Sequence, residues 1–384
     1  MNSDVLVIGA GIAGASAAAE IAARLKGTSA KVVLLEAEDA PGYHSTGRSA
    51  ALYTETYGHR VVRALAKASR PFLEHPPAGF TDHPLMGLRG ALHIARADQR
   101  PHAKRIYAEC RDLAPDIRLL TEDEARSIVP VLRPGYVAAA VLEADAMDID
   151  VHALHQGYLR RLRADGGAVV TGSRAGRLER KAGRWRVEAG SEIHTVGIVV
   201  NAGGAWADTI AEAAGLPPLG LIPKRRTAIT FDAPTDIDSR AWPLVIDVQE
   251  EFYFKPESGR LLASPADETP MPPCDVQPDE IDIATTIDRV QRATTLAVTT
   301  LRNRWAGLRS FFPDKVPVCG FDPRAEGFFW VAGQGGYGIM TSPALARLAA
   351  ALTAGDDVPA AMRAFGLSAA DLSPARLLAP NRRA

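Results

Sequence analysis

The sequence predicts a mixed α/β (α+β) fold, in which a Rossmann-like domain with a parallel sheet is joined to a second domain built on an antiparallel sheet. Three observations lead to this prediction. Residues 1–36 run in the order strand, glycine-rich turn, helix, strand. A second apolar strand begins at Gly197 and ends in another glycine turn. Between 225 and 263, short strand-like segments are separated by Pro, Gly or acidic turns, which is typical of an antiparallel sheet.

The first unit has the parts of a dinucleotide-binding motif in the expected order. The apolar run Val5–Ile8 reads as a buried strand, an Ala-rich helix follows to Leu25, and a second strand ends on Glu36. The turn after the first strand carries G-x-G-x-x-G at Gly9, Gly11 and Gly14. In this motif the glycines allow a tight turn, close approach to a pyrophosphate and close packing of helix on strand. The helix N-terminus attracts phosphates, and Glu36 can accept hydrogen bonds from ribose hydroxyls.

The remaining elements follow from hydrophobic periodicity and from breaks at Gly and Pro. Helices are expected at 60–75, 101–113, 122–128, 151–163, 279–297 and 341–353. Strands are expected at 88–95, 168–171, 185–188, 193–195, 197–206 with its glycine turn, 225–231, 244–247, 251–255, 260–263 and 327–332. The tail after 371 shows little pattern, so we expect it to be a surface appendage.

The length of 384 residues is too great for one simple core, so we expect two domains. We expect the first domain to comprise 1–80, 145–215 and 320–384, and the second to comprise 81–144 and 216–319.

Composition excludes several classes of protein. A net charge of −1 predicts no general attraction to nucleic acid or anionic lipid. No apolar stretch approaches the roughly 18 residues of a membrane span, and the N-terminus lacks the basic segment of a signal peptide. Three scattered cysteines, Cys110, Cys274 and Cys319, fit a reducing compartment. We therefore expect a cytoplasmic protein, either free or peripheral at the inner face of the membrane, with no nucleic-acid partner and no bound metal.

Several strings resemble one known family. They are G-Y-H-S-T-G-R-S-A-A at 42–51, V-V-N-A-G-G-A-W at 199–206, P-L-G-L-I-P-K-R-R at 218–226, W-A-G-L-R-S-F at 305–311 and G-Q-G-G-Y-G at 333–338. The chain resembles the FAD-dependent D-amino acid oxidase superfamily, and within it the bacterial FAD-dependent D-arginine dehydrogenases. The resemblance implies non-covalent FAD and the oxidative deamination of a D-amino acid to the 2-oxo acid and ammonia. The Cα hydrogen leaves as a hydride to flavin N5.

The resemblance also implies which residues bind FAD. They are Gly9, Gly11, Ile12, Ala13, Gly14, Glu36, Ala37, His44, Ser45, Arg48, Ser49, Ala50, Ala51, Ala175, Gly203, Trp206, Gly335, Gly336, Tyr337, Gly338 and Ile339. The helix that starts near Ile339 is expected to direct its N–H groups at the flavin's N1/C2=O edge.

Five residues are expected to hold the substrate. By resemblance, Arg309 binds the carboxylate with its planar fork and Tyr253 donates its hydroxyl to the same group. Tyr253 alternates with Phe252 and Phe254 on a strand, so it faces away from both. Tyr57 and Arg226 match further pocket positions. The carbonyl of Gly336 is expected to accept a hydrogen bond from the substrate amine.

The chain departs from the D-arginine dehydrogenases at two pocket positions. Ala91 stands where they have an acid, and Leu52 stands where they have His. Losing the partner of a buried cation weakens its binding by about 3–5 kcal/mol. We therefore predict a preference for neutral, apolar D-amino acids such as D-Met, D-Leu, D-Phe or D-Tyr. In the alternative, Glu55 replaces the missing acid and the enzyme is a D-arginine or D-lysine dehydrogenase.

Other interpretations stay open at this point. The chain could be an oxidase of the glycine or sarcosine type that reacts with O₂, a 2-hydroxy acid dehydrogenase, or a flavin-binding subunit without turnover. The electron acceptor is unknown, with a quinone or a membrane-associated carrier as candidates. His152 and His155 have the spacing of a metal pair but lack a third ligand. Cys319 lies near the region where sarcosine oxidases attach flavin, but it lacks their motif.

Overall fold

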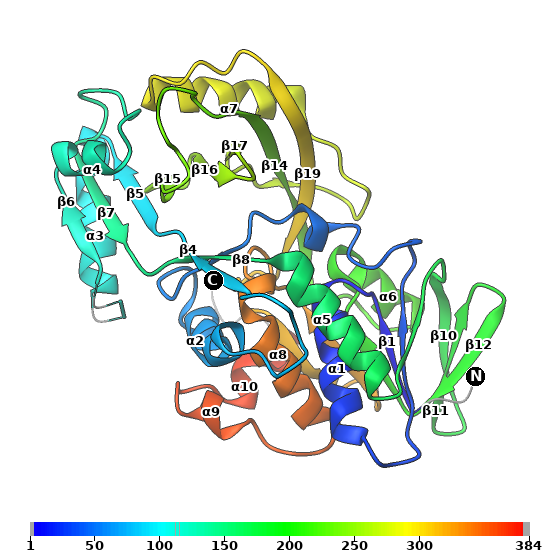
Figure 1. Cartoon of the computed structure of the whole chain (residues 1–384). Coiled ribbons are helices and arrows are strands. Elements are labelled where there is room, and N and C mark those ends of the chain that lie inside the picture. Colours follow the sequence, from blue (N-terminus) through cyan, green and yellow to red (C-terminus); the bar gives the residue numbers. More distant parts are fainter. Residues whose placement is uncertain (1–3, 112, 115, 379–384) are drawn as a thin grey trace.

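The computed structural model describes residues 4–111, 113–114 and 116–378. Figure 1 shows two bodies, one above the other, joined by several crossings of the chain. The helices are α1 (Ile12–Leu25), α2 (Arg60–Glu74), α3 (Arg100–Cys110), α4 (Glu122–Ile128), α5 (Val151–Ala164), α6 (Ala207–Ala213), α7 (Glu280–Ala293), α8 (Gly338–Thr353), α9 (Ala360–Arg363), α10 (Ala369–Leu372) and α11 (Ala375–Leu378).

The lower body in Figure 1 is built on a six-stranded sheet in the order β20-β21-β13-β1-β2-β9. Its strands are β1 (Val5–Ile8), β2 (Val32–Leu35), β9 (Ala168–Val170), β13 (Ile198–Asn201), β20 (Val318–Phe321) and β21 (Phe328–Ala332). All neighbours are parallel except β20 and β21. The predicted return of the chain to this sheet, through 168–171 and 197–206, is therefore confirmed.

Side-chain alternation along β1 explains the two layers on this sheet. Val5 and Val7 pack with α1, α5 and α8 on one face. Leu6 and Ile8 pack on the other face with α6 and a small antiparallel sheet. That sheet consists of β10 (Ala175–Lys181), β11 (Arg184–Ala189) and β12 (Glu192–Val196). The sheet is thus covered on both sides, as expected for a parallel sheet.

The upper body is built on a nine-stranded, mostly antiparallel sheet in the order β18-β14-β17-β16-β15-β5-β7-β6, with β19 also paired to β14. Its strands are β5 (Ala91–Ala95), β6 (Arg118–Leu120), β7 (Ala139–Glu143), β14 (Ile222–Asp232), β15 (Leu244–Asp247), β16 (Tyr253–Glu257), β17 (Arg260–Ser264), β18 (Thr269–Pro270) and β19 (Leu301–Phe311). One face packs against α4 and α7. The predicted mixed fold with a second, antiparallel sheet is confirmed, whereas the exact domain boundaries remain a prediction.

A third, small sheet lies where the two bodies meet. It consists of β3 (Leu52–Tyr53), β8 (Met147–Ile149) and β4 (Met86–Leu88), in the order β3-β8-β4. The predicted strand 88–95 is therefore two strands, because Gly90 has a left-handed φ of +73°. The long strands β14 and β19 run from the upper sheet toward the lower body in Figure 1.

The expected surface appendage after 371 is wrong for the described residues of the tail. Leu372 is buried in the core of the lower body, and Leu377 and Leu378 pack against the cluster around β13 and β21. Arg376 donates to the backbone oxygen of Val316 and to Asp314. Residues 379–384 of the predicted tail and residue 112 of the predicted helix 101–113 lie outside the described residues.

Candidate active site

Two adjoining recesses lie along the glycine turns of the lower body, and one of them reaches the upper sheet. The first is lined at one end by Ala37, Ser173 and Ala175. The second extends from the G-x-G turn to the nine-stranded sheet of the upper body. Four residues line both recesses: Gly9, His44, Gly203 and Trp206. The two therefore form one continuous site, with the elongated shape that a dinucleotide requires.

The first glycine turn forms a cradle that larger residues would fill. Gly9 has a φ of +100°, and a Cβ placed there would lie 2.5 Å from the backbone oxygen of Ala202. A Cβ on Gly14 would lie 1.8 Å from the backbone oxygen of Gly9. Gly14 thus acts by packing α1 against the turn, whereas Gly9, Gly11, Ile12 and Ala13 line the recess itself.

Glu36 lies at the end of β2, as its motif requires. Its carboxylate accepts hydrogen bonds from the backbone N–H groups of Ala10, at 2.9 Å, and Glu38, at 3.0 Å. These contacts fix the carboxylate at the wall of the recess, and each oxygen retains a further lone pair. The residue is therefore placed to receive ribose hydroxyls.

The loop predicted to hold the flavin is attached to β19. The hydroxyl of Ser45 donates to the backbone oxygen of Leu308 at 2.7 Å, and Arg48 donates to that of Ala306 at 3.0 Å. The loop also contacts the first unit, because Thr46 Oγ1 accepts from the N–H of Ile12 at 2.9 Å. Of the predicted loop residues, those that line the site are His44, Ser45, Arg48, Ser49 and Ala50.

The predicted carboxylate-binding pair lies at the far end of the site. Arg309, on β19, and Tyr253, on β16, both line it. Tyr253 faces away from Phe252 and Phe254, which pack in a different cluster, so that prediction is confirmed. Burial raises the pKa of Tyr253, but Arg309 and Arg226 outweigh it and hold the pKa below its ordinary value. A phenol beside two guanidinium groups is a strong donor to a carboxylate.

Gly336 lies directly against this pair. A Cβ at Gly336 would come within 2.9 Å of Nη1 of Arg309, so only glycine leaves room for the guanidinium in its observed position. Gly335 has a φ of +52°, and a Cβ there would lie 2.0 Å from the ring of Phe311. The turn brings its backbone, followed by Gly338 and Ile339 at the start of α8, to the wall of the site.

Tyr57 lies beside this end of the site and contacts both bodies. Its ring packs on Tyr337 at 5.1 Å between centroids, and its hydroxyl donates to Oε2 of Glu250 at 3.3 Å. Burial raises the pKa of Tyr57 to about 12, against the opposing effect of Arg309. Glu250 is a polar neighbour that the sequence did not reveal, because it lies in the turn between β15 and β16.

Arg226 is mostly buried rather than solvated. It is 8% exposed, and its Nε donates to the backbone oxygen of Asp267 at 2.9 Å. Glu268 lies 3.5 Å from its Nη2. Arg226 lines the site, and its predicted role in the substrate pocket stays a prediction.

The face of the upper sheet around Tyr253 is apolar. Leu244, Tyr253 and Leu262 form a buried cluster, and Leu52 and Ile246 pack against it. Ala91 pairs across the sheet with both Leu244 and Glu143. The two departures from the D-arginine dehydrogenases thus lie at or beside one apolar wall.

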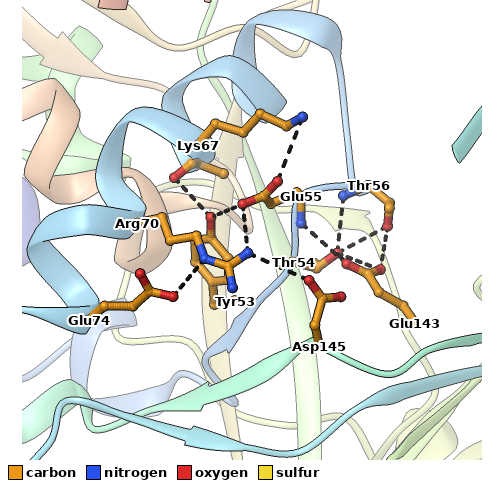
Figure 2. Close-up of polar contacts among 10 residues, drawn as sticks. Tyr53, Thr54, Glu55, Thr56, Lys67, Arg70, Glu74, Glu143 and Asp145 are labelled. Carbon is orange, nitrogen blue, oxygen red and sulfur yellow. Dashed lines mark hydrogen bonds and ion pairs between the residues drawn. The ribbon is translucent and has the colours of Figure 1, made fainter. Parts of the chain in front are cut away.

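The alternative in which Glu55 supplies the missing acid is contradicted by its contacts. The Glu55 carboxylate accepts from the Tyr53 hydroxyl at 2.8 Å and from Arg70 Nη1 at 3.1 Å, and Lys67 Nζ lies 3.7 Å away (Figure 2). Two cations of α2, Arg70 and Lys67, therefore already neutralise it. The position of Glu55 two residues before Tyr57 suggested that it could be the pocket acid, but its carboxylate instead contacts Tyr53 and helix α2.

Two further candidates have structural roles. His155 Nε2 bonds to the backbone oxygen of Ala10 at 2.9 Å, which orients the first turn. Cys319 is fully buried in the core of the lower body, and burial raises the pKa of its thiol. Among the described residues, no group of three His, Cys, Asp or Glu side chains is placed to hold a metal ion.

Three predicted cofactor residues lie outside the wall of the continuous site: Gly14, Ala51 and Tyr337. Residues that line it without having been predicted include Thr46, Ala202, Gln334, Ser173 and Arg174. Ser45-Thr46-Gly47 continues the small polar loop, so its composition was the signal for Thr46. Ala202, Gln334, Ser173 and Arg174 line the site because each lies shortly after the end of a strand of the six-stranded sheet.

A pH prediction arises from His93, which lies between Val141 and Ile246 on this sheet. Burial lowers the pKa of His93 to about 4. Below about pH 6.5 the imidazole of His93 binds a proton in the unfolded chain but stays neutral in the folded protein. The free energy of unfolding is therefore highest above that pH and declines as the pH falls toward 4. The urea midpoint should fall over this window, and His93→Gln should reduce the fall. His75→Gln, at the exposed end of α2, is the control, and equal slopes in both variants would refute the prediction.

Comparisons with known proteins identify a family and a fold. The family described as "FAD dependent oxidoreductase" matches residues 4–352. The chain is 25% identical to the "Uncharacterized oxidoreductase YurR" of Bacillus subtilis (strain 168) over 373 residues, which is 91% of this chain and 94% of that protein. It is similar to the solved structure of L-proline dehydrogenase from P. horikoshii, with a TM-score of 0.81, 22% identity and 98% of both chains covered. Glycine oxidase from Geobacillus kaustophilus gives a TM-score of 0.81 and 20% identity, with 93% of this chain and 95% of that chain covered.

Proposed function

We propose, since the chain belongs to the FAD-dependent oxidoreductase family, that it catalyses the oxidative deamination of a D-amino acid. The products are a 2-oxo acid and ammonia. FAD would supply the two-electron acceptor of this chemistry. Its place would be the continuous site described above. The observation that carries the proposal is the meeting of Arg309, Tyr253 and Gly336 at one end of that site.

The protein's own groups would hold the substrate through its two constant parts. The guanidinium of Arg309 would bind the carboxylate through parallel hydrogen bonds, and the Tyr253 hydroxyl would donate to the same group. The backbone oxygen of Gly336, next to that guanidinium, would accept from the amine. Fixing both groups orients Cα, and such orientation supplies much of the catalysis when no proton relay is needed.

The side-chain preference follows from the wall of the upper sheet. Leu52, Leu244 and Ile246 offer apolar contact, and Ala91 brings no charge. The neighbouring acid, Glu143, already accepts hydrogen bonds from three donors of the chain itself. A cationic side chain would lose hydration without a free partner, so neutral, apolar D-amino acids such as D-Met, D-Leu or D-Phe should be preferred over D-Arg and D-Lys.

The acceptor and the location complete the proposal. We infer a dehydrogenase, in line with the resemblance to the D-arginine dehydrogenases, with a quinone or a membrane-associated carrier as acceptor. A cytoplasmic location, free or at the inner face of a membrane, fits this role. Within the described residues, no helix is long and apolar enough to cross a membrane.

An anaerobic substrate panel tests this function. The purified holoenzyme should lose its flavin absorbance rapidly with neutral apolar D-amino acids and slowly with D-Arg and D-Lys. A difference of several hundredfold in rate constant over KM corresponds to the unpaired cation, about 3–5 kcal/mol. The L-enantiomers, glycine and L-proline serve as stereochemical controls, and D-lactate tests the 2-hydroxy acid alternative.

Each other outcome has a definite meaning. Rapid reduction by D-Arg would overturn the apolar preference and direct attention to Glu250, the acid that contacts Tyr57. Reduction by D-lactate alone would replace the amine by a hydroxyl as the reacting group. Rapid peroxide formation in air would identify an oxidase. No reduction by any of these compounds would refute the proposed reaction.

A further inference from the structure

A buried carboxylate lies beside the site without a role in the proposed reaction. Glu143, the last residue of β7, is 2% exposed. Its oxygens accept from the Thr54 hydroxyl at 2.8 Å, the Thr56 hydroxyl at 2.5 Å and the backbone N–H of Glu55 at 3.3 Å. Figure 2 shows these contacts converging on one side chain. All three donors come from a single short segment of the chain.

The partners of Glu143 distinguish it from an ordinary ion pair. Among the described residues, no Lys, Arg or His nitrogen lies within 4 Å of its carboxylate. Burial raises the pKa of this carboxyl, and the Thr56 and Thr54 hydroxyls oppose the rise. A buried acid without a cation is costly for the fold, so the hydrogen bonds from the three donors in residues 54–56 compensate for its burial.

The segment that Glu143 holds has a left-handed residue at each end. Ala51 has a φ of +32° and Gly58 has a φ of +85°. A Cβ at Gly58 would lie 3.0 Å from the ring of Tyr337, so the chain must pass close to that ring. Tyr57 lies between the held residues and Gly58. Its place against Tyr337 is therefore set from both sides.

A second set of contacts holds the opposite side of the segment. Arg70 of α2 bonds to the Glu55 carboxylate at 3.1 Å, and its Nη1 also lies 3.5 Å from Asp145, two residues after Glu143 (Figure 2). The end of β7 thus contacts residues 54–56 directly and also through α2. The upper sheet fixes a segment that begins in the flavin loop of the lower body.

We propose that Glu143 is a positioning residue, which holds residues 54–56 and thereby fixes Tyr57 beside Arg309. The inference rests on the proposed function, because it assigns Tyr57 to the substrate end of the site. Without the carboxylate, the two hydroxyls and the Glu55 N–H lose their common acceptor. The segment can then move about its two left-handed ends, and Tyr57 leaves Tyr337.

Hydrogen exchange tests whether Glu143 holds residues 54–56, and it needs no substrate. In the Glu143→Ala holoenzyme, the amides of residues 54–58 should exchange at least about tenfold faster. Glu143→Gln keeps one acceptor oxygen, and its amide N–H can donate to the hydroxyl oxygens of Thr54 and Thr56. The amides of residues 54–58 should therefore exchange as slowly in this variant as in the wild type. Asp322→Asn removes a different buried carboxylate, far from the site, and controls for general destabilisation. Unchanged exchange in Glu143→Ala would overturn the proposal.

Kinetics then test whether the effect passes through Tyr57. With a D-amino acid that reduces the flavin, Glu143→Ala should lower kcat/KM by roughly ten- to hundredfold, because a small displacement of a group beside the substrate can have that cost. In a Tyr57→Ala background the same change should have an effect of less than about threefold, since coupled residues are not additive. Additive losses would overturn the role through Tyr57. If no substrate is found, the proposed function fails, but the exchange result still shows whether Glu143 holds residues 54–56.

Discussion

Replacing Arg309 with methionine should lower kcat/KM for the best D-amino acid by several hundredfold or more. The guanidinium is the charged partner of the substrate carboxylate, and leaving that carboxylate unpaired in a buried site costs about 3–5 kcal/mol. Burial lowers the pKa of this guanidinium, but Tyr253, Tyr57 and Glu250 outweigh it and raise the pKa, so the charge is present throughout the assay range. The loss should appear in stopped-flow reduction as well as in turnover with an artificial acceptor.

Two further variants sharpen this prediction. Arg309→Lys keeps the charge but not the planar fork, so its loss should be intermediate. Arg304→Met changes an exposed arginine on the same strand, whose partner is Glu280, and should leave the kinetics unchanged. If Arg309→Met were as active as Arg304→Met, Arg309 would not bind the carboxylate. Flavin content measured in parallel separates a substrate effect from loss of cofactor.

The parts of this site that could be predicted are those encoded by short, local patterns. The G-x-G-x-x-G turn needs only its own backbone geometry and the strands beside it. Tyr253 could be assigned to the pocket face because side chains alternate along a strand. Both predictions depend only on a few residues that are neighbours in the sequence, so the sequence alone is enough to make them.

The long strand β19 was not predicted from the sequence, and its residues show why. Its first half carries the exposed residues Arg302, Asn303 and Arg304, so the sequence there has no apolar alternation. The strand forms because it pairs with β14 along nearly its whole length. That pairing joins segments about eighty residues apart, and no local pattern records it.

Glu143 and Glu55 illustrate the same limit for the site. No role was assigned to Glu143 from the sequence, because its partners lie 87 to 89 residues away. Glu55 was an alternative candidate for the pocket acid, because it lies two residues before Tyr57 in sequence. The acid that contacts Tyr57 is Glu250, 193 residues distant. Which carboxylate faces a pocket is decided by the packing of the two bodies.

Replacing Gly14 with alanine should remove FAD binding while leaving much of the secondary structure intact. The new Cβ would lie 1.8 Å from the backbone oxygen of Gly9 and 3.2 Å from Cβ of Ala202. Helix α1 would have to move away from β1, which costs about 1–3 kcal/mol or more in a close-packed core. The same movement displaces the helix N-terminus from the phosphates, so the effect on the cofactor adds to the effect on packing.

Flavin absorbance relative to protein absorbance, and the Kd for added FAD, measure this loss. We expect Kd to rise at least about a hundredfold, because both the packing and the phosphate contacts are affected. Gly87→Ala is the matched control, since a Cβ at Gly87 has no neighbour within 4 Å. Wild-type Kd in Gly14→Ala would mean that α1 can shift without cost to the site. Loss of FAD in Gly14→Ala but not in Arg309→Met would assign the two ends of the continuous site to cofactor and substrate respectively.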